Sequence, residues 1–93
     1  MKDRLINKIV ALQFNISFLA ITERNNKNLD KIFCYYDDIV DYLNANCEIK
    51  IENALDVIYE EVFKLNYKNN IYHAEIKNDI LNLNKYIKDY LNI

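Results

Sequence analysis

The segment from Leu5 to Leu19, LINKIVALQFNISFL, decides the fold class. Its apolar residues recur at steps of four and three, which is the spacing of one buried stripe along an α-helix. Three later segments repeat this pattern, and none alternates apolar and polar residues with the period of two that is typical of strands. The four stripes are Leu5, Ile9, Leu12, Ile16 and Leu19; Leu29, Phe33, Tyr36, Val40 and Leu43; Ile51, Leu55, Ile58, Val62 and Leu65; and Ile76, Ile80, Leu83, Ile87 and Tyr90.

These stripes predict an all-α protein with helices near residues 3–24, 28–44, 47–67 and 71–92. Short connections between long helices force sequential neighbours to run antiparallel. The expected architecture is therefore an up-down antiparallel four-helix bundle, in which residues 1–93 form one domain.

The connections must be built without glycine or proline, because the 93-residue chain contains neither. This absence excludes Gly-rich phosphate loops and dinucleotide fingerprints. Asparagine clusters at residues 25–28, 44–46 and 69–70, and it can both cap a helix N-terminus and adopt the left-handed conformation that ends a helix. We expect asparagine to do both, with Asn28 as the N-cap of the second helix.

The first helix carries a second apolar face in addition to its core stripe. Ile6, Val10, Phe14 and Phe18 lie on it. One interpretation is that this helix is the most central one and is wrapped by the other three. The alternative is that the second face forms a contact between two protomers, since obligate interfaces resemble a core cut in half.

Charge is distributed unevenly along the chain. The net charge is −2, yet residues 30–61 hold nine acids and two bases. The expected binding surface for a partner protein on the second and third helices consists of Asp37, Asp38, Asp41, Tyr35, Tyr42, Glu48, Glu52, Asp56 and Glu60. Acids four residues apart repel one another within a helix, so their alignment suggests a use. A basic site, such as that of a nucleic-acid-binding enzyme, would complement them.

The alternative for this acidic surface is structural. Acidic residues on helices are commonly solvated, and the fold could neutralise them with lysines from the flanking helices. The candidates for such neutralisation are Lys8, Lys77, Lys85 and Lys88.

One acidic motif resembles a known magnesium site. Asp37, Asp38 and Asp41 spell DDIVD, which resembles the DDxxD motif of isoprenoid synthases. That resemblance covers five residues and implies carboxylates that hold Mg²⁺ on a diphosphate. Those enzymes need a bundle several times larger than this chain.

A second resemblance is closer in size. Glu60 and Glu61 begin an element that resembles the EExxE motif of all-α nucleotide pyrophosphohydrolases, which implies Mg²⁺-dependent hydrolysis. Lys64 replaces the third acid, and a downstream element that starts at Glu75 ends in Asn78. A divergent hydrolase of this class is one alternative function.

Other sites are not expected. Cys34 and Cys47 lack the spacing of a zinc site, and we predict no metal, no cofactor and no catalytic residue. A sequence pI of about 5.3 argues against direct nucleic-acid binding. The uncharged run from Ile9 to Thr22 is shorter than the roughly 20 residues that span a bilayer, so we expect a core helix and a cytoplasmic protein.

The predicted function is that of a small non-enzymatic protein-binding module: an inhibitor, an immunity or antitoxin-like protein, or an anti-defence protein. Abundant Asn, Ile, Lys and Tyr, which have AT-rich codons, suggest an AT-rich genome such as that of a phage or virus. The other alternative is a structural subunit that self-assembles by pairing its basic helices with the acidic ones of the next copy.

Overall fold

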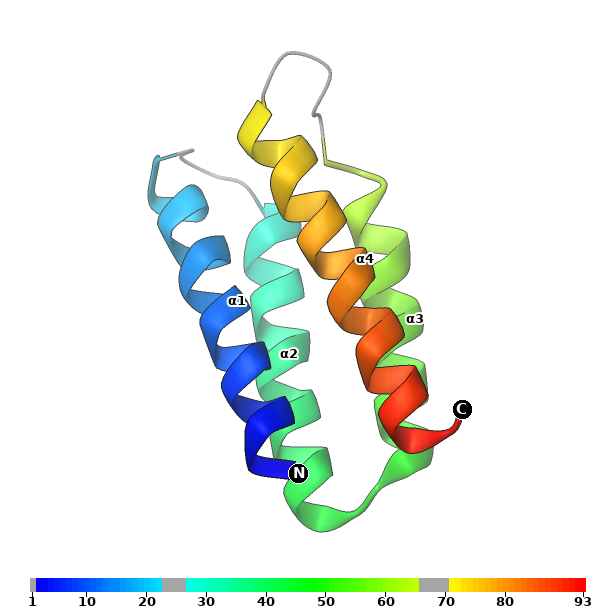
Figure 1. The fold of residues 1–93 in the computed structure, drawn as a ribbon. Coiled ribbons are helices and arrows are strands. Elements are labelled where there is room, and N and C mark those ends of the chain that lie inside the picture. The colour runs from blue at the N-terminus through cyan, green and yellow to red at the C-terminus, as the bar shows by residue number, and fades with distance from the viewer. Residues whose placement is uncertain (1, 23–26, 66–70) are drawn as a thin grey trace.

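Four helices make up the computed structural model, which describes residues 2–22, 27–65 and 71–93. They are α1 (Lys2–Thr22), α2 (Lys27–Ala45), α3 (Glu48–Val62) and α4 (Ile71–Leu91). Consecutive helices run in opposite directions, as Figure 1 shows. The all-α four-helix prediction is confirmed, and no strand occurs within the described ranges.

The helices form a closed ring of neighbours. Helix α2 packs against α1 and α3, and α4 completes the ring by packing against α3 and α1, while α1 and α3 lie diagonally opposite (Figure 1). Helices of up to 21 residues rise about 30 Å, which agrees with the 38 × 19 × 18 Å extents of the molecule.

The core contains the predicted stripes with some changes. All five residues of the first stripe and all five of the third are buried. On α2, Ile32 and Ile39 are buried, whereas Phe33 and Val40 are only half-buried. On α4 the buried stripe ends at Ile87. The next residue of the predicted stripe, Tyr90, lies near the helix C-terminus and is exposed.

Predicted helix boundaries differ most at the end of α3. This helix ends at Val62, and Lys64 and Leu65 donate backbone hydrogen bonds to the carbonyls of Glu61 and Val62 in tighter, three-residue turns. The prediction that the third helix continues through residue 65 is wrong, although Leu65 is still buried in the core. Residues 23–24 and 66–67 of the predicted helices lie outside the described ranges, as do the asparagines at 25–26 and 69–70.

The prediction that α1 is wrapped by the other three helices is wrong. Its stripe from Leu5 to Leu19 faces the core, but Val10, Phe14 and Phe18 are exposed and Ile6 is half-buried. The reason is geometric: α1 contacts only α2 and α4, so its outward side has no covering helix. The segment Lys2–Ile21, which includes the charged first turns of α1, is also long and apolar enough to cross a membrane when judged by length and composition alone.

One buried polar pair links opposite sides of the core. The Tyr36 hydroxyl donates a 2.7 Å hydrogen bond to Asn84 Oδ1, which joins α2 to α4. Burial raises the pKa of Tyr36, so the phenol stays protonated. Asn84 Nδ2 is buried without a hydrogen-bond partner among the described residues. Because a polar pair in an aliphatic core can be satisfied in only one alignment, it specifies the register of α2 against α4.

A buried carboxylate connects α2 to α3. Glu61 is 5% exposed and accepts hydrogen bonds from Asn28 Nδ2 at 2.7 Å and from the Nζ atoms of Lys31 and Lys64, each at 3.1 Å. Asn28 is the second residue of α2, which begins at Lys27, so the prediction that it caps this helix is wrong. Its amide serves a tertiary contact instead.

These donors make the folded state prefer the ionised form of Glu61. The hydrogen bond from Asn28 is the largest cause, the two lysines add to it, and together they outweigh the effect of burial. The pKa of Glu61 falls from 4.5 to about 2. Since the folded-state pKa lies below the unfolded one, the stabilisation is complete above pH 4.5 and is lost as the pH falls towards 2.

We expect Glu61→Gln to lower the free energy of unfolding at neutral pH by about 2 kcal/mol, because it removes the charge that two lysines face. Urea denaturation at several pH values measures this. The difference from wild type should shrink as the pH falls from 4.5 towards 2. Glu60→Gln, on the neighbouring exposed residue, is the control and should change stability little. Equal effects of the two substitutions would contradict the role of Glu61.

Asparagine ends two of the helices in left-handed conformation. Asn46 follows α2 with φ of 58°, and Asn92 follows α4 with φ of 59°. At the first, the amide of Asn46 donates to the carbonyl of Leu43 and the amide of Cys47 to that of Tyr42. At the end of α4, the amides of Asn92 and Ile93 donate the equivalent pair of bonds to the carbonyls of Asp89 and Lys88, and both ends are Schellman motifs. The prediction that asparagine replaces glycine at helix ends is confirmed at these positions.

Asn46→Ala should lower the free energy of unfolding by about 1 kcal/mol, because alanine resists the left-handed conformation. Asn46→Gly should be at least as stable as wild type. Thermal and chemical denaturation measure both. The matched control is Asn44→Ala, two residues earlier and still helical, where alanine should be tolerated or stabilising. Destabilisation by alanine at both positions would argue against a special role for the turn.

Candidate protein-docking surface

All seven predicted acidic contact residues are exposed, but they lie in two groups. Three belong to α2 and four to α3. Between the groups runs the α2–α3 seam. Here Lys31 and Lys64 form ion pairs with Glu61. Lys50 places its Nζ 5.6 Å from the ring centroid of Tyr42. The two predicted tyrosines, Tyr35 and Tyr42, are half-buried against the core. The seam therefore separates the two acidic groups with basic side chains.

Among the acids of α2, Asp37 faces α1. Gln13 of α1 donates from Nε2 to Asp37 Oδ1 at 3.0 Å and to the Phe33 carbonyl at 3.2 Å. Asp41 lies one turn further along the same side of α2, and Asp38 points outward. Asp37 thus takes part in an internal contact with α1.

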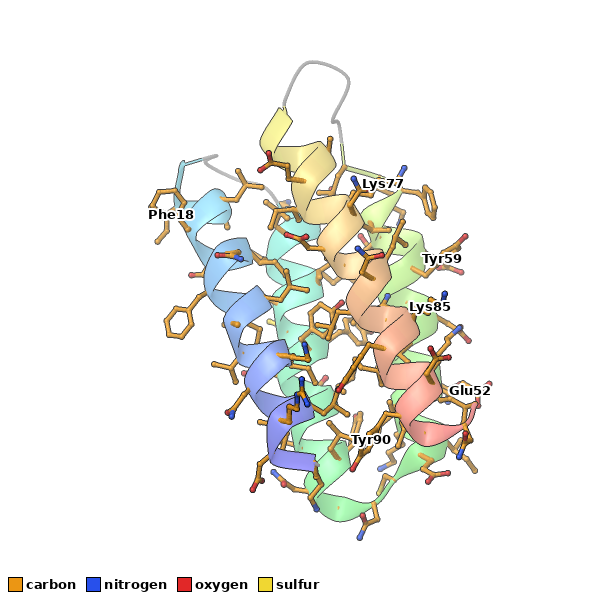
Figure 2. The ribbon with its side chains drawn as sticks, viewed as in Figure 1. Phe18, Glu52, Tyr59, Lys77, Lys85 and Tyr90 are labelled. Carbon is orange, nitrogen blue, oxygen red and sulfur yellow. The ribbon has the colours of Figure 1, made fainter. Side chains whose placement is uncertain are left out.

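The acids of α3 form a continuous exposed surface together with apolar residues that we had not predicted to be part of it. Ile49, Tyr59 and Phe63 are 77%, 54% and 47% exposed. We call this surface the α3 outer face. Its members are Glu48, Ile49, Glu52, Asp56, Tyr59, Glu60 and Phe63. Glu52 and Tyr59 project from this flank of the bundle in Figure 2.

The aromatic residues of the α3 outer face are held in a defined geometry. The rings of Tyr59 and Phe63 pack edge to face, with centroids 4.9 Å apart and an interplanar angle of 71°. Lys77 of α4 places its Nζ 4.8 Å from the Phe63 centroid. Because the two rings pack against each other and lie beside α4, they form one apolar contact point for a partner.

A second periodicity in the sequence identifies these missed residues. Positions 49, 52, 56, 59 and 63 are spaced by three and four, which is the same spacing as that of the core stripe but on the opposite side of the helix. The core stripe alone does not include Ile49, Tyr59 and Phe63, so it gives no reason to expect them on a binding surface. Their placement among acids is the signal of an outward, mixed surface.

Two of the four flanking lysines lie over aromatic rings. Lys8 of α1 has its Nζ 5.0 Å from the Tyr86 centroid, and Lys77 lies over Phe63 as described. The buried carboxylate of Glu61 is instead paired with Lys31 of α2 and with Lys64 of the turn after α3. The exposed acids of α3 are open to solvent, and their surface is accessible to a partner.

The carboxylates of the hydrolase-like element are arranged differently from a metal site. Glu61 directs its oxygens at Asn28, Lys31 and Lys64, whereas Glu60 next to it is exposed. In the described part of the chain, no three His, Cys, Asp or Glu side chains gather closely enough to hold a metal ion. The charge that Mg²⁺ would supply to Glu61 is already provided by two lysines.

Comparison of the chain with protein family models, with curated proteins and with solved structures finds no match.

Because Glu61 is neutralised within the fold, we expect Mg²⁺ up to about 10 mM to cause no saturable change at Glu60 or Glu61. Backbone amide shifts in NMR spectra measure this, with NaCl at matched ionic strength as the control. Saturable shifts centred on these residues would contradict the expectation and favour the hydrolase alternative.

Proposed function

We propose that this chain is a small non-enzymatic module that binds another protein through the α3 outer face. Its partner presents a basic site with apolar pockets, as in a nucleic-acid-binding enzyme. The corresponding biological class is an inhibitor, an immunity or antitoxin-like protein, or an anti-defence protein. Exposed Cys34 and half-buried Cys47 are free thiols, which suits action in a reducing cytoplasm.

The observation that carries this proposal is the combination of acids and ordered aromatic rings on one exposed helix. The four acids from Glu48 to Glu60 are spaced four residues apart, about one turn of α3 each, and together they span about 18 Å. A row of this kind is unfavourable in isolation, because like charges at this spacing repel. A basic partner removes that repulsion and is attracted from a distance.

The apolar members of this surface supply the second part of the interaction. Binding energy at protein interfaces concentrates in a few well-packed side chains, often aromatic, inside a polar rim. Tyr59 and Phe63 fit the role of such anchors, and Ile49 lies about four turns before Phe63 at the other end of the row. The acids between them give the contact its specificity for a basic surface.

The acids of α2 have a smaller role in this proposal. Asp37 is held by Gln13, and the seam with Lys31 and Lys50 lies between α2 and the α3 outer face. Asp38 and Asp41 could touch only a partner that extends across that seam. The proposal therefore distinguishes the two acidic groups that the sequence alone treats as one.

Charge reversal tests the proposal. We expect Glu52→Lys with Asp56→Lys to weaken binding to the physiological partner at least about tenfold and to reduce its salt dependence. Capture from the native host with mass spectrometry identifies the partner, and calorimetry with the purified partner measures the affinity.

Two control variants carry the same change in charge. Asp3→Lys with Asp89→Lys alters exposed acids on α1 and α4 and should leave binding intact. Asp38→Lys with Asp41→Lys should have a smaller effect than the α3 variant. The proposal fails if the α3 variant binds the partner as tightly as wild type over a range of salt concentrations.

A further inference from the structure

We propose that two copies of this chain associate through the outward side of α1, in an antiparallel α1–α1 contact. The α1 outer face consists of Val10, Phe14, Phe18 and Ile21. It is a different surface from the α3 outer face, and the proposal does not depend on what α3 binds.

The α1 outer face is too apolar and too exposed to be an ordinary solvated helix face. Phe14 and Phe18 are 72% and 71% exposed, and Ile21 is 77% exposed. Figure 2 shows Phe18 projecting from the side of the bundle opposite to Glu52 and Tyr59. Soluble monomers rarely expose contiguous apolar patches larger than a few hundred Å², and larger ones mark interaction sites. This row follows one side of one helix, which suits contact with another helix.

The absence of charge on this surface favours a second copy as its occupant. No charged residue occurs between Ile9 and Ile21, so two such faces meet without repulsion and without an unpaired buried charge. Helices that bind at a membrane surface usually present a polar side rich in lysine and arginine. Here the bundle carries a net charge of −2, and Lys8 lies over Tyr86 of α4. An anionic membrane is the less suitable partner.

A symmetric antiparallel contact matches the order of the residues. With the two-fold axis near the middle of the row, Phe14 faces Phe18 of the second copy and Val10 faces Ile21 of the second copy. This arrangement also aligns the two helix dipoles antiparallel. A groove of about 370 Å³ runs beside the row, with Ser17, Ala20 and Phe33 in its lining, and it can receive an aromatic ring from the other copy. The groove is also lined by Asp30 of α2, an exposed acid that is the one charged residue among the described residues of this lining.

The surface available is sufficient for a contact of this kind. The exposed parts of the two phenylalanine side chains amount to roughly 200 to 350 Å² per copy. A standard interface buries about 800 Å² per partner. Val10, Ile21 and the groove walls extend the row on both sides, but the contact is smaller than the standard one and belongs to the weaker class of specific interfaces. Because α1 and α3 are diagonal in the bundle, the α3 outer faces lie at the far ends of the pair.

Sedimentation velocity and light scattering across micromolar to millimolar concentrations test the proposal. The wild-type chain should sediment with twice the monomer mass of 11.2 kDa, with little dependence on salt, because the contact is apolar. Phe14→Glu with Phe18→Glu should give the monomer mass at the same concentrations. Circular dichroism checks that this variant keeps its helices, which is expected since both rings are exposed.

The matched control is Ile49→Glu with Phe63→Glu, which alters exposed apolar residues of α3 and should leave the dimer intact. A monomeric wild type at all concentrations would overturn the proposal, and so would a dimer that survives the α1 double variant. An oligomer that dissociates in high salt would indicate charge pairing between acidic and basic helices instead. A monomer that co-sediments with phosphatidylcholine vesicles would assign the face to a membrane.

Discussion

Burial of one aliphatic stripe on each of four helices is the constraint on which this structure depends. Leu5, Ile9 and Ile16 on α1 have counterparts in Ile51, Leu55 and Ile58 on α3, across a core that contains few polar atoms. Aliphatic packing is strong but tolerates several alignments of one helix against another. The polar contacts select among them: Glu61 joins α3 to α2, Gln13 joins α1 to α2, and the Tyr36–Asn84 bond joins α2 to α4.

The fold could be predicted because its signals are local and periodic. The stripe of α1 contains five buried residues, as its spacing indicates, and that of α3 contains four, with a fifth, Leu65, in the turn that follows the helix. Asn46 ends α2 in the conformation expected of a glycine substitute. The departures have tertiary causes. Asn28 was expected to cap a helix, but it lies inside α2, where its Nδ2 donates to Glu61 of another helix. Tyr90 continues the apolar period of α4 beyond the point where a neighbouring helix covers it.

The candidate surfaces were harder to predict, because exposure depends on which helices are neighbours. The second apolar side of α1 was visible in the sequence, but whether other helices cover it depends on α1 contacting only α2 and α4. Likewise the run of acids from residue 30 to residue 61 suggested one surface, whereas the antiparallel packing of α2 and α3 places a basic seam within it. Counting charges along the sequence does not show where this seam lies, since its position depends on the rotation of each helix about its own axis.

The tight Asn46 turn also has a consequence for how the chain reaches its folded state. It joins α2 and α3, which share the most extensive helix–helix contact in the bundle, while the contact between α1 and α4 brings together the two ends of the chain. Closing a short loop costs less conformational entropy than closing a long one. We therefore expect the α2–α3 hairpin to form early, with α1 and α4 adding to it later, in the rapid manner typical of helical proteins rich in local contacts.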